Sequence, residues 1–314
     1  MTPSRRAPTN LAASVREKLR QIAVARGQEL QVILTRYGVE RLLYRLSQVP
    51  SGERFVLKGA ALFYLWDGEI PRPTQDVDLL GFGDSAPEAV QRLFREMCNA
   101  TVDADGLTFS PSSVTAARMR GRQEYGGLRV KLTAMLGNVR IPLQVDVGFG
   151  DAVTPDPRMA PFPPLLSFPA PRVRAYPAET VVAEKFQAMV SLGIANTRMK
   201  DFYDLHHLAE TRDFDGASLA KAIKGTFERR GTTMPMVTPL ALSEAFVSDD
   251  EKQAQWRAFL RRGRLERLAA FGRVVARIAE FVMPVVDAVR DDSPFDSRWT
   301  PTAGWTANRA SRPE

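Results

Sequence analysis

Residues 72–80, RPTQDVDLL, hold two aspartates inside a stretch that is otherwise typical of a β-strand. Successive side chains of a strand point to opposite faces of the sheet, so Asp76 and Asp78, two residues apart, point the same way. Two carboxylates that lie side by side repel each other unless positive charge lies close to both. The pattern therefore indicates a bound cation or basic side chains at this strand.

A third aspartate interrupts a second predicted strand. In the segment VRIPLQVDVGFG, Asp146 shares the face of Gln144 and lies opposite to the valines on either side. Mg²⁺ prefers oxygen ligands and is commonly held by one or two carboxylates together with substrate phosphates and water. We therefore predict that Asp76, Asp78 and Asp146 hold Mg²⁺, with two ions able to activate an attacking hydroxyl and to steady a triphosphate. The alternative is that each aspartate pairs with an arginine, Arg72 being the nearest, or faces solvent.

The segment before the acidic strand, RFVLKGAALFYLWDG, predicts a short strand, a turn of small residues and an apolar helix. Gly59 and Ala60 in the turn leave backbone N–H groups accessible, and the start of a helix favours a phosphate at that point. A triphosphate can then lie between the turn and the metal. A close-packed turn between a strand and a helix also requires small residues, so that interpretation stays open.

The pattern along the chain predicts an α+β protein in which a small mixed sheet is followed by a helical domain. Within the sheet region, Gly137 and Asn138 separate two alternating stretches and predict a two-residue β-hairpin turn. The predicted segments are N-terminal helices packed on the core (1–50), the core (51–150), a proline-rich extended connector (151–177), a helical domain (178–290) and a disordered tail (291–314).

Composition excludes several classes of protein. The 314 residues are 44% hydrophobic, and they include no apolar run as long as a membrane-spanning helix and no signal-peptide pattern, so we expect a cytoplasmic protein without a membrane partner. One cysteine and two histidines exclude a His/Cys zinc cluster, which leaves oxygen ligands for any metal. The net charge of +7 fits a polyanionic partner, although a solvated basic surface explains it equally well.

Five blocks of the sequence occur in an order that resembles one known family. The blocks are FVLKGAALFYLW, RPTQDVDLLGFG, IPLQVDVGFGD, ETVVAEKFQAMVSL and RMKDFYDLHHL. Together they cover most of the chain, roughly 11–259, and resemble the AbiEii/AbiGii-type nucleotidyltransferase toxins of type IV toxin–antitoxin systems, members of the polymerase-β-like nucleotidyltransferase superfamily. The resemblance implies a polymerase-β-like core, an NTP substrate, Mg²⁺ as cofactor and a cognate antitoxin as partner.

The resemblance assigns roles to residues of the first half. It implies that Asp76 and Asp78 bind metal and that Asp146 is a metal ligand or the base that takes a proton from the attacking hydroxyl. Many superfamily members have Gly-Ser in the turn, whereas this chain has Gly59-Ala60. Phosphate contact here would therefore depend on backbone N–H groups and Lys58. The expected nucleotide-binding residues of this half are Lys58, Gly59, Ala60, Thr74 and Arg72, the last placed to steady the acidic pair or a phosphate.

The second half contributes a further pair. The resemblance implies that Lys185 contacts phosphate as a point charge and that Asp201 is a catalytic aspartate, so that the helical domain completes the active site. On a helix Asp201 and Asp204 share a face, and Lys200 can reach Asp204 at i+4. The alternative is a surface helix with ion pairs and no catalytic role.

Similar proteins transfer a nucleotide to an acceptor, and several are thought to modify the 3′ end of tRNA and so block translation. Arginines of the C-terminal half give modest support for an RNA acceptor, because a helical stripe of them suits a phosphate backbone. Trp256 and Phe259 lie near this stripe and are either base-stacking or core residues. The arginines are Arg229, Arg230, Arg257, Arg261, Arg262, Arg264 and Arg267.

Two other functions stay open from the sequence. One is a non-catalytic module that binds a nucleotide or RNA, which the altered Gly59-Ala60 turn suggests. The other is a nucleotidyltransferase whose acceptor is a protein or a small molecule, although a basic surface disfavours a small cationic acceptor.

Overall fold

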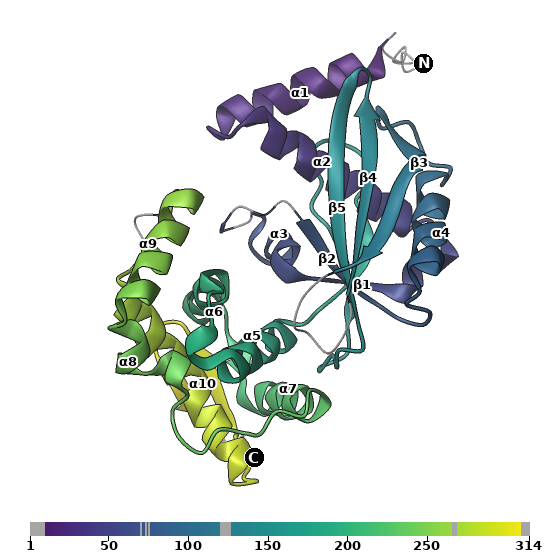
Figure 1. The fold of residues 1–314 in the computed structure, drawn as a ribbon. Coiled ribbons are helices and arrows are strands. Elements are labelled where there is room, and N and C mark those ends of the chain that lie inside the picture. The colour runs from purple at the N-terminus through teal and green to yellow at the C-terminus, as the bar shows by residue number, and fades with distance from the viewer. Residues whose placement is uncertain are drawn as a thin grey trace, which may run out of the picture. The chain divides into compact units, whose positions relative to one another are not determined.

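The computed structural model describes residues 10–69, 71–72, 74, 76–119, 127–265 and 269–308. The chain divides into two compact units. Unit 1 comprises Met1–Gly150 and Arg158–Ala175, and unit 2 comprises Asp151–Pro157 and Tyr176–Glu314. The α+β class, with a mixed sheet first and a largely helical second half, is confirmed (Figure 1).

The described strands of unit 1 form a seven-stranded mixed sheet in the order β3-β4-β5-β2-β1-β7-β6. At its centre β2 runs parallel to β5 and antiparallel to β1. The strands are β1 (Phe55–Lys58), β2 (Asp76–Gly81), β3 (Leu107–Arg118), β4 (Leu128–Leu136), β5 (Val139–Phe149), β6 (Arg158–Pro161) and β7 (Arg172–Ala175). The helices are α1 (Leu11–Ala25), α2 (Leu30–Leu46), α3 (Leu62–Asp67) and α4 (Pro87–Cys98), with 3-10 turns at Pro50–Arg54 and Gly59–Ala61.

One face of this sheet is the core of unit 1. Val77, Val145 and Val130 are each at most 3% exposed. They share that face because they are register partners on neighbouring strands. α2 packs on the same face, since a Cβ at Gly38 would contact the side chains of Ile141 and Leu143. The aspartates of β2 and β5 have the opposite parity, so they lie on the other face, here called the polar face.

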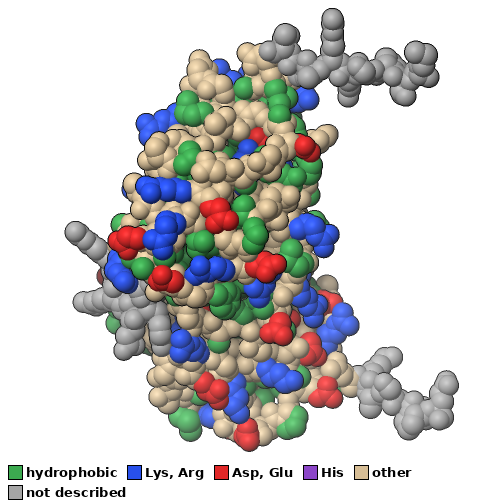
Figure 2. All heavy atoms as spheres, turned by 90° about the vertical axis from the view of Figure 1, so that its right-hand side faces the viewer, with side chains coloured by type: hydrophobic (Ala, Val, Ile, Leu, Met, Phe, Trp, Pro, Cys, Tyr) green, Lys and Arg blue, Asp and Glu red, His purple; other side chains and the backbone are tan. Residues whose placement is uncertain are grey.

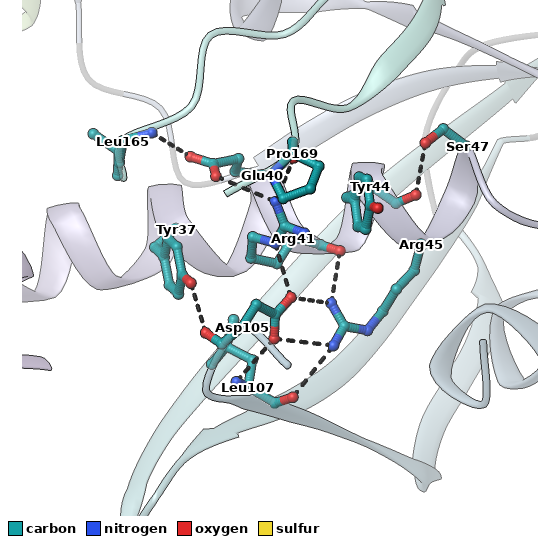
Figure 3. Close-up of polar contacts among 10 residues, drawn as sticks. All are labelled: Tyr37, Glu40, Arg41, Tyr44, Arg45, Ser47, Asp105, Leu107, Leu165 and Pro169. Atoms are coloured by element: carbon teal, nitrogen blue, oxygen red, sulfur yellow. Dashed lines mark hydrogen bonds and ion pairs between the residues drawn. The ribbon is translucent and has the colours of Figure 1, made fainter. Parts of the chain in front are cut away.

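Ionic contacts hold α2 to the rest of unit 1 (Figure 3). Arg41 Nε lies 2.8 Å and Arg45 Nη1 lies 2.7 Å from Asp105 Oδ2, just before β3, and all three side chains are buried. Tyr37 Oη donates a 2.6 Å hydrogen bond to the Asp105 carbonyl oxygen. Burial disfavours the ionised Asp105, but the hydrogen bonds from the two arginines outweigh it and lower the pKa of this carboxyl. The cluster fixes the start of β3 on the helix.

Glu40 connects α2 to the segment that leads into β7. Its Oε2 accepts a 2.7 Å hydrogen bond from the backbone N–H of Leu165, and its Oε1 lies 3.7 Å from Arg41 Nη1. The side chain is fully buried, and burial raises the pKa of Glu40 to about 7 despite these partners. The carboxyl therefore titrates near neutral pH.

Part of the predicted connector 151–177 belongs to the sheet. β6 pairs antiparallel with β7, and β7 pairs with β1, so this segment adds two strands to one edge. Prolines are tolerated here because edge strands leave one side of the ladder without a partner. Residues 158–175 are thus a structural part of unit 1.

Unit 2 is built around α10, which packs against α6 and α7. Among the described residues, side chains cap three of its helices: Asp215 Oδ2 accepts from Ser218 N–H at α7, Ser243 Oγ from Phe246 N–H at α8, and Asp249 Oδ1 from Lys252 N–H at α9. The helices are α5 (Ala178–Leu192), α6 (Met199–Thr211), α7 (Gly216–Arg229), α8 (Glu244–Val247), α9 (Asp250–Gly263) and α10 (Phe271–Arg290), with 3-10 turns at Gly193–Ala195 and Leu240–Leu242.

The prediction that 291–314 are disordered is wrong for the part that the structure describes. β9 (Ser297–Thr300) and β10 (Gly304–Ala307) form a three-stranded sheet with β8 (Phe214–Asp215). Trp299 anchors it: the side chain is fully buried and its Nε1 donates a 2.9 Å hydrogen bond to the Ala209 carbonyl oxygen. A polar composition did not exclude order, because Trp299 and Trp305 pack against Phe281 of α10.

No helix among the described residues is long and apolar enough to cross a membrane.

Candidate active site

A row of four charged residues crosses the centre of the unit 1 sheet. Lys58 on β1 is the register partner of Asp78 on β2, Asp78 of Asp146 on β5, and Asp146 of Arg129 on β4. Register partners project from the same face, and neighbouring strands are about 4.8 Å apart, so the row spans roughly 14 Å on the polar face. Asp78 and Asp146 thus lie between Lys58 and Arg129. The positive charge of these two cations offsets the repulsion between the two carboxylates.

A second row runs beside the first. Asp76 is the partner of Gln144 on β5, and Gln144 is the partner of Lys131 on β4. Thr74 lies close by, and its Oγ1 donates a 3.3 Å hydrogen bond to the Asp76 carbonyl oxygen. Arg72 is buried at 8% exposure. Pro73 and Gln75, between these residues, lie outside the described part of the chain.

The turn after β1 lies directly against Asp78. Gly59 has a φ of +70°, and a Cβ at this position would collide with the Asp78 carboxylate. Ala60 is buried, and the regular helix begins only at Leu62 and is six residues long, so a helix dipole contributes little here. The turn and the Lys58 side chain therefore lie next to Asp78.

Arg129 is a site residue that the sequence analysis missed. Its Nε donates to Asp146 Oδ1 at 2.9 Å and its Nη2 donates to Asp146 Oδ2 at 2.8 Å, a bidentate ion pair. The hydrogen bond to Asp146 raises the pKa of Arg129, and the charges of Asp76 and Asp78 raise it further. The sequence could have revealed this pair. The predicted hairpin turn at Gly137-Asn138 sets the register of the two strands, and counting residues outward from the turn pairs position 129 with position 146.

Unit 2 brings Lys185 and Asp201 together. Lys185 Nζ on α5 lies 2.7 Å from Asp201 Oδ1 and 2.7 Å from Asp204 Oδ2, both on α6, and the two carboxylates are buried. Arg198 Nε lies 2.7 Å from Asp201 Oδ2. Asp204 therefore interacts with Lys185, whereas the sequence suggested Lys200, which is exposed. The surface-helix alternative does not fit these buried carboxylates.

The arginine stripe of α9 is less extensive than the sequence suggests. Arg257 and Arg261 are exposed, but α9 ends at Gly263 and Arg264 follows with a left-handed φ of 54°. Trp256 is 2% exposed and stacks on Phe271 with ring centroids 5.0 Å apart, so this aromatic is a core residue. Arg230 is held by ion pairs with Asp151 at 2.9 Å and Glu184 at 3.5 Å, and Arg267 lies outside the described residues.

The molecular face drawn in Figure 2 carries Lys and Arg side chains interspersed with Asp and Glu side chains. The excess of positive charge in the composition is therefore not gathered on this face. A polyanion would bind such a surface weakly, because neighbouring acidic groups cancel the attraction.

A cleft of about 640 Å³ lies elsewhere on unit 1, between α1 and the β4–β5 turn. Its lining includes Arg16, Arg20, Gly137 and Asn138. Asp146 lies eight residues along β5 from this turn, roughly 27 Å for an extended strand. The cleft is therefore separate from the charged rows.

The donor set of the polar face fits a hard cation. Asp76 and Asp78 are half-buried carboxylates that share a face beside the Gly59–Ala61 turn, and Mg²⁺ is commonly held by one or two carboxylates plus substrate phosphates. In the part of the chain that the structure describes, no three His, Cys, Asp or Glu side chains are grouped to hold a metal ion.

Comparison with known proteins identifies the family. The family model for the nucleotidyl transferase AbiEii toxin of type IV toxin–antitoxin systems matches residues 41–277. No curated protein sequence matches the chain.

Three solved structures resemble the chain at low sequence identity. MenT4, nucleotidyltransferase toxin Rv2826c from Mycobacterium tuberculosis H37Rv, is 18% identical with a TM-score of 0.48, covering 89% of this chain and 99% of that one. A putative nucleotidyltransferase from H. pylori is 15% identical with a TM-score of 0.49, covering 85% and 100%. JHP933 from Helicobacter pylori is 14% identical with a TM-score of 0.46, covering 91% and 96%. By its family match, the chain belongs to the AbiEii nucleotidyltransferase toxins of type IV toxin–antitoxin systems and is a nucleotidyltransferase.

Proposed function

We propose that this enzyme transfers a nucleotide from an NTP to the 3′ end of an RNA, with tRNA as the acceptor that blocks translation, and that the transfer depends on Mg²⁺. The observation that supports the proposal is the row of Lys58, Asp78, Asp146 and Arg129 on the polar face. It places Asp78, which shares its face with Asp76, between cations that suit phosphate groups.

In the proposed reaction the 3′ hydroxyl of the acceptor attacks the α-phosphorus of the NTP. A bond forms between the 3′ oxygen and phosphorus, the bond from phosphorus to the pyrophosphate oxygen breaks, and the hydroxyl proton passes to a base. Mg²⁺ held by Asp76 and Asp78, with two ions as the sequence suggests, would stabilise the charge of the triphosphate and acidify the hydroxyl.

The protein's own groups position the substrate. Lys58 and the backbone N–H groups of the Gly59–Ala61 turn bind the triphosphate, and Arg72 and Thr74 support the acidic strand. In unit 2, Lys185 is the proposed phosphate contact, and Asp201 and Asp204 fix the place of its ammonium group. Two buried carboxylates hold this ammonium group in one position, whereas the flexible stem of an exposed lysine lets its ammonium move.

The proposal extends to location and partner. We infer that the enzyme acts in the cytoplasm, where its NTP and RNA substrates occur, and that an antitoxin encoded with it counteracts the modification. The family's toxin–antitoxin description supports this inference.

The test is incubation of the purified protein with total bacterial RNA, Mg²⁺ and each α-labelled NTP in turn. We expect label on RNA of tRNA size with the wild type and none with Asp76→Asn. Asp103→Asn is the matched control, because Asp103 is an exposed aspartate of the same unit, remote in sequence from the charged rows. Labelling that persists in Asp76→Asn would refute the proposed metal centre.

A further inference from the structure

The polar face carries an uncharged amide beside the carboxylates. Gln144 on β5 is the register partner of Asp76 on β2 and of Lys131 on β4, so the three side chains form one row. Neighbouring strands are about 4.8 Å apart, and Gln144 lies two residues from Asp146 along β5, about 6.8 Å in an extended strand. The half-buried Gln144 is therefore adjacent to two of the carboxylates.

The in-line geometry of the proposed transfer decides where the acceptor lies. Lys58 and the Gly59 turn, where the triphosphate is proposed to bind, lie on the β1 side of Asp78. The attacking oxygen and the leaving oxygen lie on opposite sides of the α-phosphorus. With the pyrophosphate directed toward β1, the acceptor hydroxyl comes from the opposite side, over β5 and β4, where Gln144 and Lys131 lie.

This part of the polar face is exposed and basic. Lys131 and Arg140 are exposed, as are Thr108 and Thr115 on the neighbouring β3. Of the side chains that β3, β4 and β5 present on this face, three are cationic and one is acidic. Two positive charges in excess of the acid make this surface complementary to a polyanion. The cations are Arg129, Lys131 and Arg140, and the acid is Asp146, which pairs with Arg129.

Lys131 and Arg140 lie at increasing distances from the reaction centre. Lys131 is across from Gln144, and Arg140 is four residues from Gln144 along β5, roughly 14 Å in an extended strand. Arg140 Nη2 donates a 3.5 Å hydrogen bond to Thr133 Oγ1, which holds its guanidinium over β4. The two cations thus follow one line that leads away from the carboxylates, as the backbone of a bound strand would.

We propose that Lys131 and Arg140 bind backbone phosphates of the acceptor RNA and that Gln144 binds the 2′ hydroxyl of its terminal ribose. The 2′ oxygen is on the carbon next to the one that carries the attacking 3′ oxygen, so a side chain beside the carboxylates reaches it. An amide supplies both a donor and an acceptor, as a hydroxyl does. Because DNA lacks this hydroxyl, Gln144 selects RNA over DNA. This inference rests on the proposed function and names the residues that recognise its acceptor.

The first test measures binding of a short single-stranded RNA at several salt concentrations. Each lost phosphate contact reduces the slope of log K against log salt by about 0.7, so Lys131→Gln and Arg140→Gln should each flatten it by about that amount. Arg95→Gln is the control, because Arg95 is an exposed arginine of α4, which packs on the opposite face of the sheet through Phe94 and Phe55. Unchanged slopes in both strand variants would overturn the inference.

The second test compares two RNA strands that differ only in the last nucleotide, which has either a ribose or a 2′-deoxyribose. We expect the wild type to bind the ribose end about three- to tenfold more tightly, the effect of one hydrogen bond between neutral groups. Gln144→Leu should bind both ends equally, whereas Thr108→Val, which removes an exposed hydroxyl from β3, should keep the preference. A wild type without this preference, or a Gln144→Leu protein that keeps it, would refute the role of Gln144.

Binding of ATP distinguishes the RNA surface from the nucleotide site. Mn²⁺ replaces Mg²⁺ in this measurement, because it takes the same carboxylate ligands. The double variant Lys131→Gln/Arg140→Gln should bind ATP within about twofold of the wild type, since three strand spacings, roughly 14 Å, separate Lys131 from Lys58. Lost ATP affinity with an unchanged RNA slope would assign these cations to the nucleotide, and the inference would be lost.

The outcomes separate this inference from the proposed function. If the wild type and the variants bind RNA as expected but no NTP labels the RNA, the proposed transfer fails and the RNA surface stands. If the wild type labels RNA while the slopes of the variants stay unchanged, the proposed function stands and the inference is overturned.

Discussion

Gly59 lies so close to Asp78 that any Cβ at position 59 would collide with the carboxylate. The turn that is proposed to bind phosphate and the aspartate that is proposed to bind metal are thus in direct contact. This contact depends on a glycine with a φ of +70°, a backbone conformation that residues with a side chain rarely adopt. A substitution here changes the position of Asp78 in addition to the backbone.

We expect Gly59→Ala to lose Mn²⁺ affinity and nucleotidyl transfer, because Asp78 must move to admit the methyl group. Gly68→Ala is the matched control: Gly68 has a φ of +78°, and an added Cβ meets nothing within 4 Å. Both variants carry backbone strain of about 1–2 kcal/mol, measurable by chemical unfolding, but only Gly59→Ala should lose transfer. Equal activity in the two would show that Asp78 tolerates displacement.

Replacement of Lys185 tests the buried cluster of unit 2. Lys185→Met removes the cation that Asp201 and Asp204 share and leaves Asp201 with Arg198. Breaking a buried ion pair by removing one partner costs about 3–5 kcal/mol of unfolding free energy. Lys221→Met, at an exposed lysine, should stay within about 0.5 kcal/mol of the wild type.

Transfer activity separates a catalytic Lys185 from a structural one. Lys185→Arg keeps the positive charge, but a planar guanidinium does not reproduce the contacts of a compact ammonium. We expect this variant to regain part of the stability and little of the activity. Full recovery of both would indicate that only the charge is needed.

Glu40 makes the stability of unit 1 depend on pH. Its pKa is raised from 4.5 to about 7 by burial, so the folded protein keeps a proton that the unfolded chain has already lost. The unfolding free energy should therefore fall as pH rises from about 4.5 to 7, by up to about 3 kcal/mol, and level off above.

Glu40→Gln should remove most of that slope, because the amide stays neutral and can accept the Leu165 hydrogen bond. The variant should thus be more stable than the wild type above pH 7, as measured by urea unfolding across the pH range. Glu17→Gln, at a glutamate about half exposed on α1, should leave the slope as it is. An unchanged slope in Glu40→Gln would assign the pH dependence to other groups.

Trp299 tests whether the C-terminal strands support unit 2. Its side chain is fully buried, and its Nε1 donates to the Ala209 carbonyl oxygen. Its ring centroid lies 4.5 Å from Arg277 Cζ. Trp299→Ala should cost about 3–5 kcal/mol, seen as a lower thermal midpoint. Thr306→Ala, at an exposed position of β10, should have little effect.

Local patterns of the sequence predicted the central strand and the hairpin correctly. The alternation around Asp76 and Asp78 places both on one face, and the Gly137-Asn138 turn joins β4 to β5 as expected. Such features depend on residues a few positions apart, so periodicity and turn chemistry suffice to find them. The family resemblance added the expected roles of Lys185 and Asp201, and the structure places these two in contact.

The same local patterns failed where strands are irregular or short. β3 was not predicted, because its stretch SPSS resembles a loop and the pairing with β4 shifts register between Ser110 and Thr115. β9 and β10 were assigned to a disordered tail, since four-residue strands show little periodicity. These strands are stable because distant residues pair with them.

The sequence by itself determined which residues are charged, which face of each strand they share and where the hairpin turns. Only the tertiary structure decided that β2 lies between β1 and β5, which sets Asp78 between Lys58 and Asp146. It also decided that Lys185 takes Asp201 and Asp204 as partners. The physical reason is that side-chain parity is a property of adjacent residues, whereas the order of strands and the packing of helices depend on contacts between residues far apart in the chain.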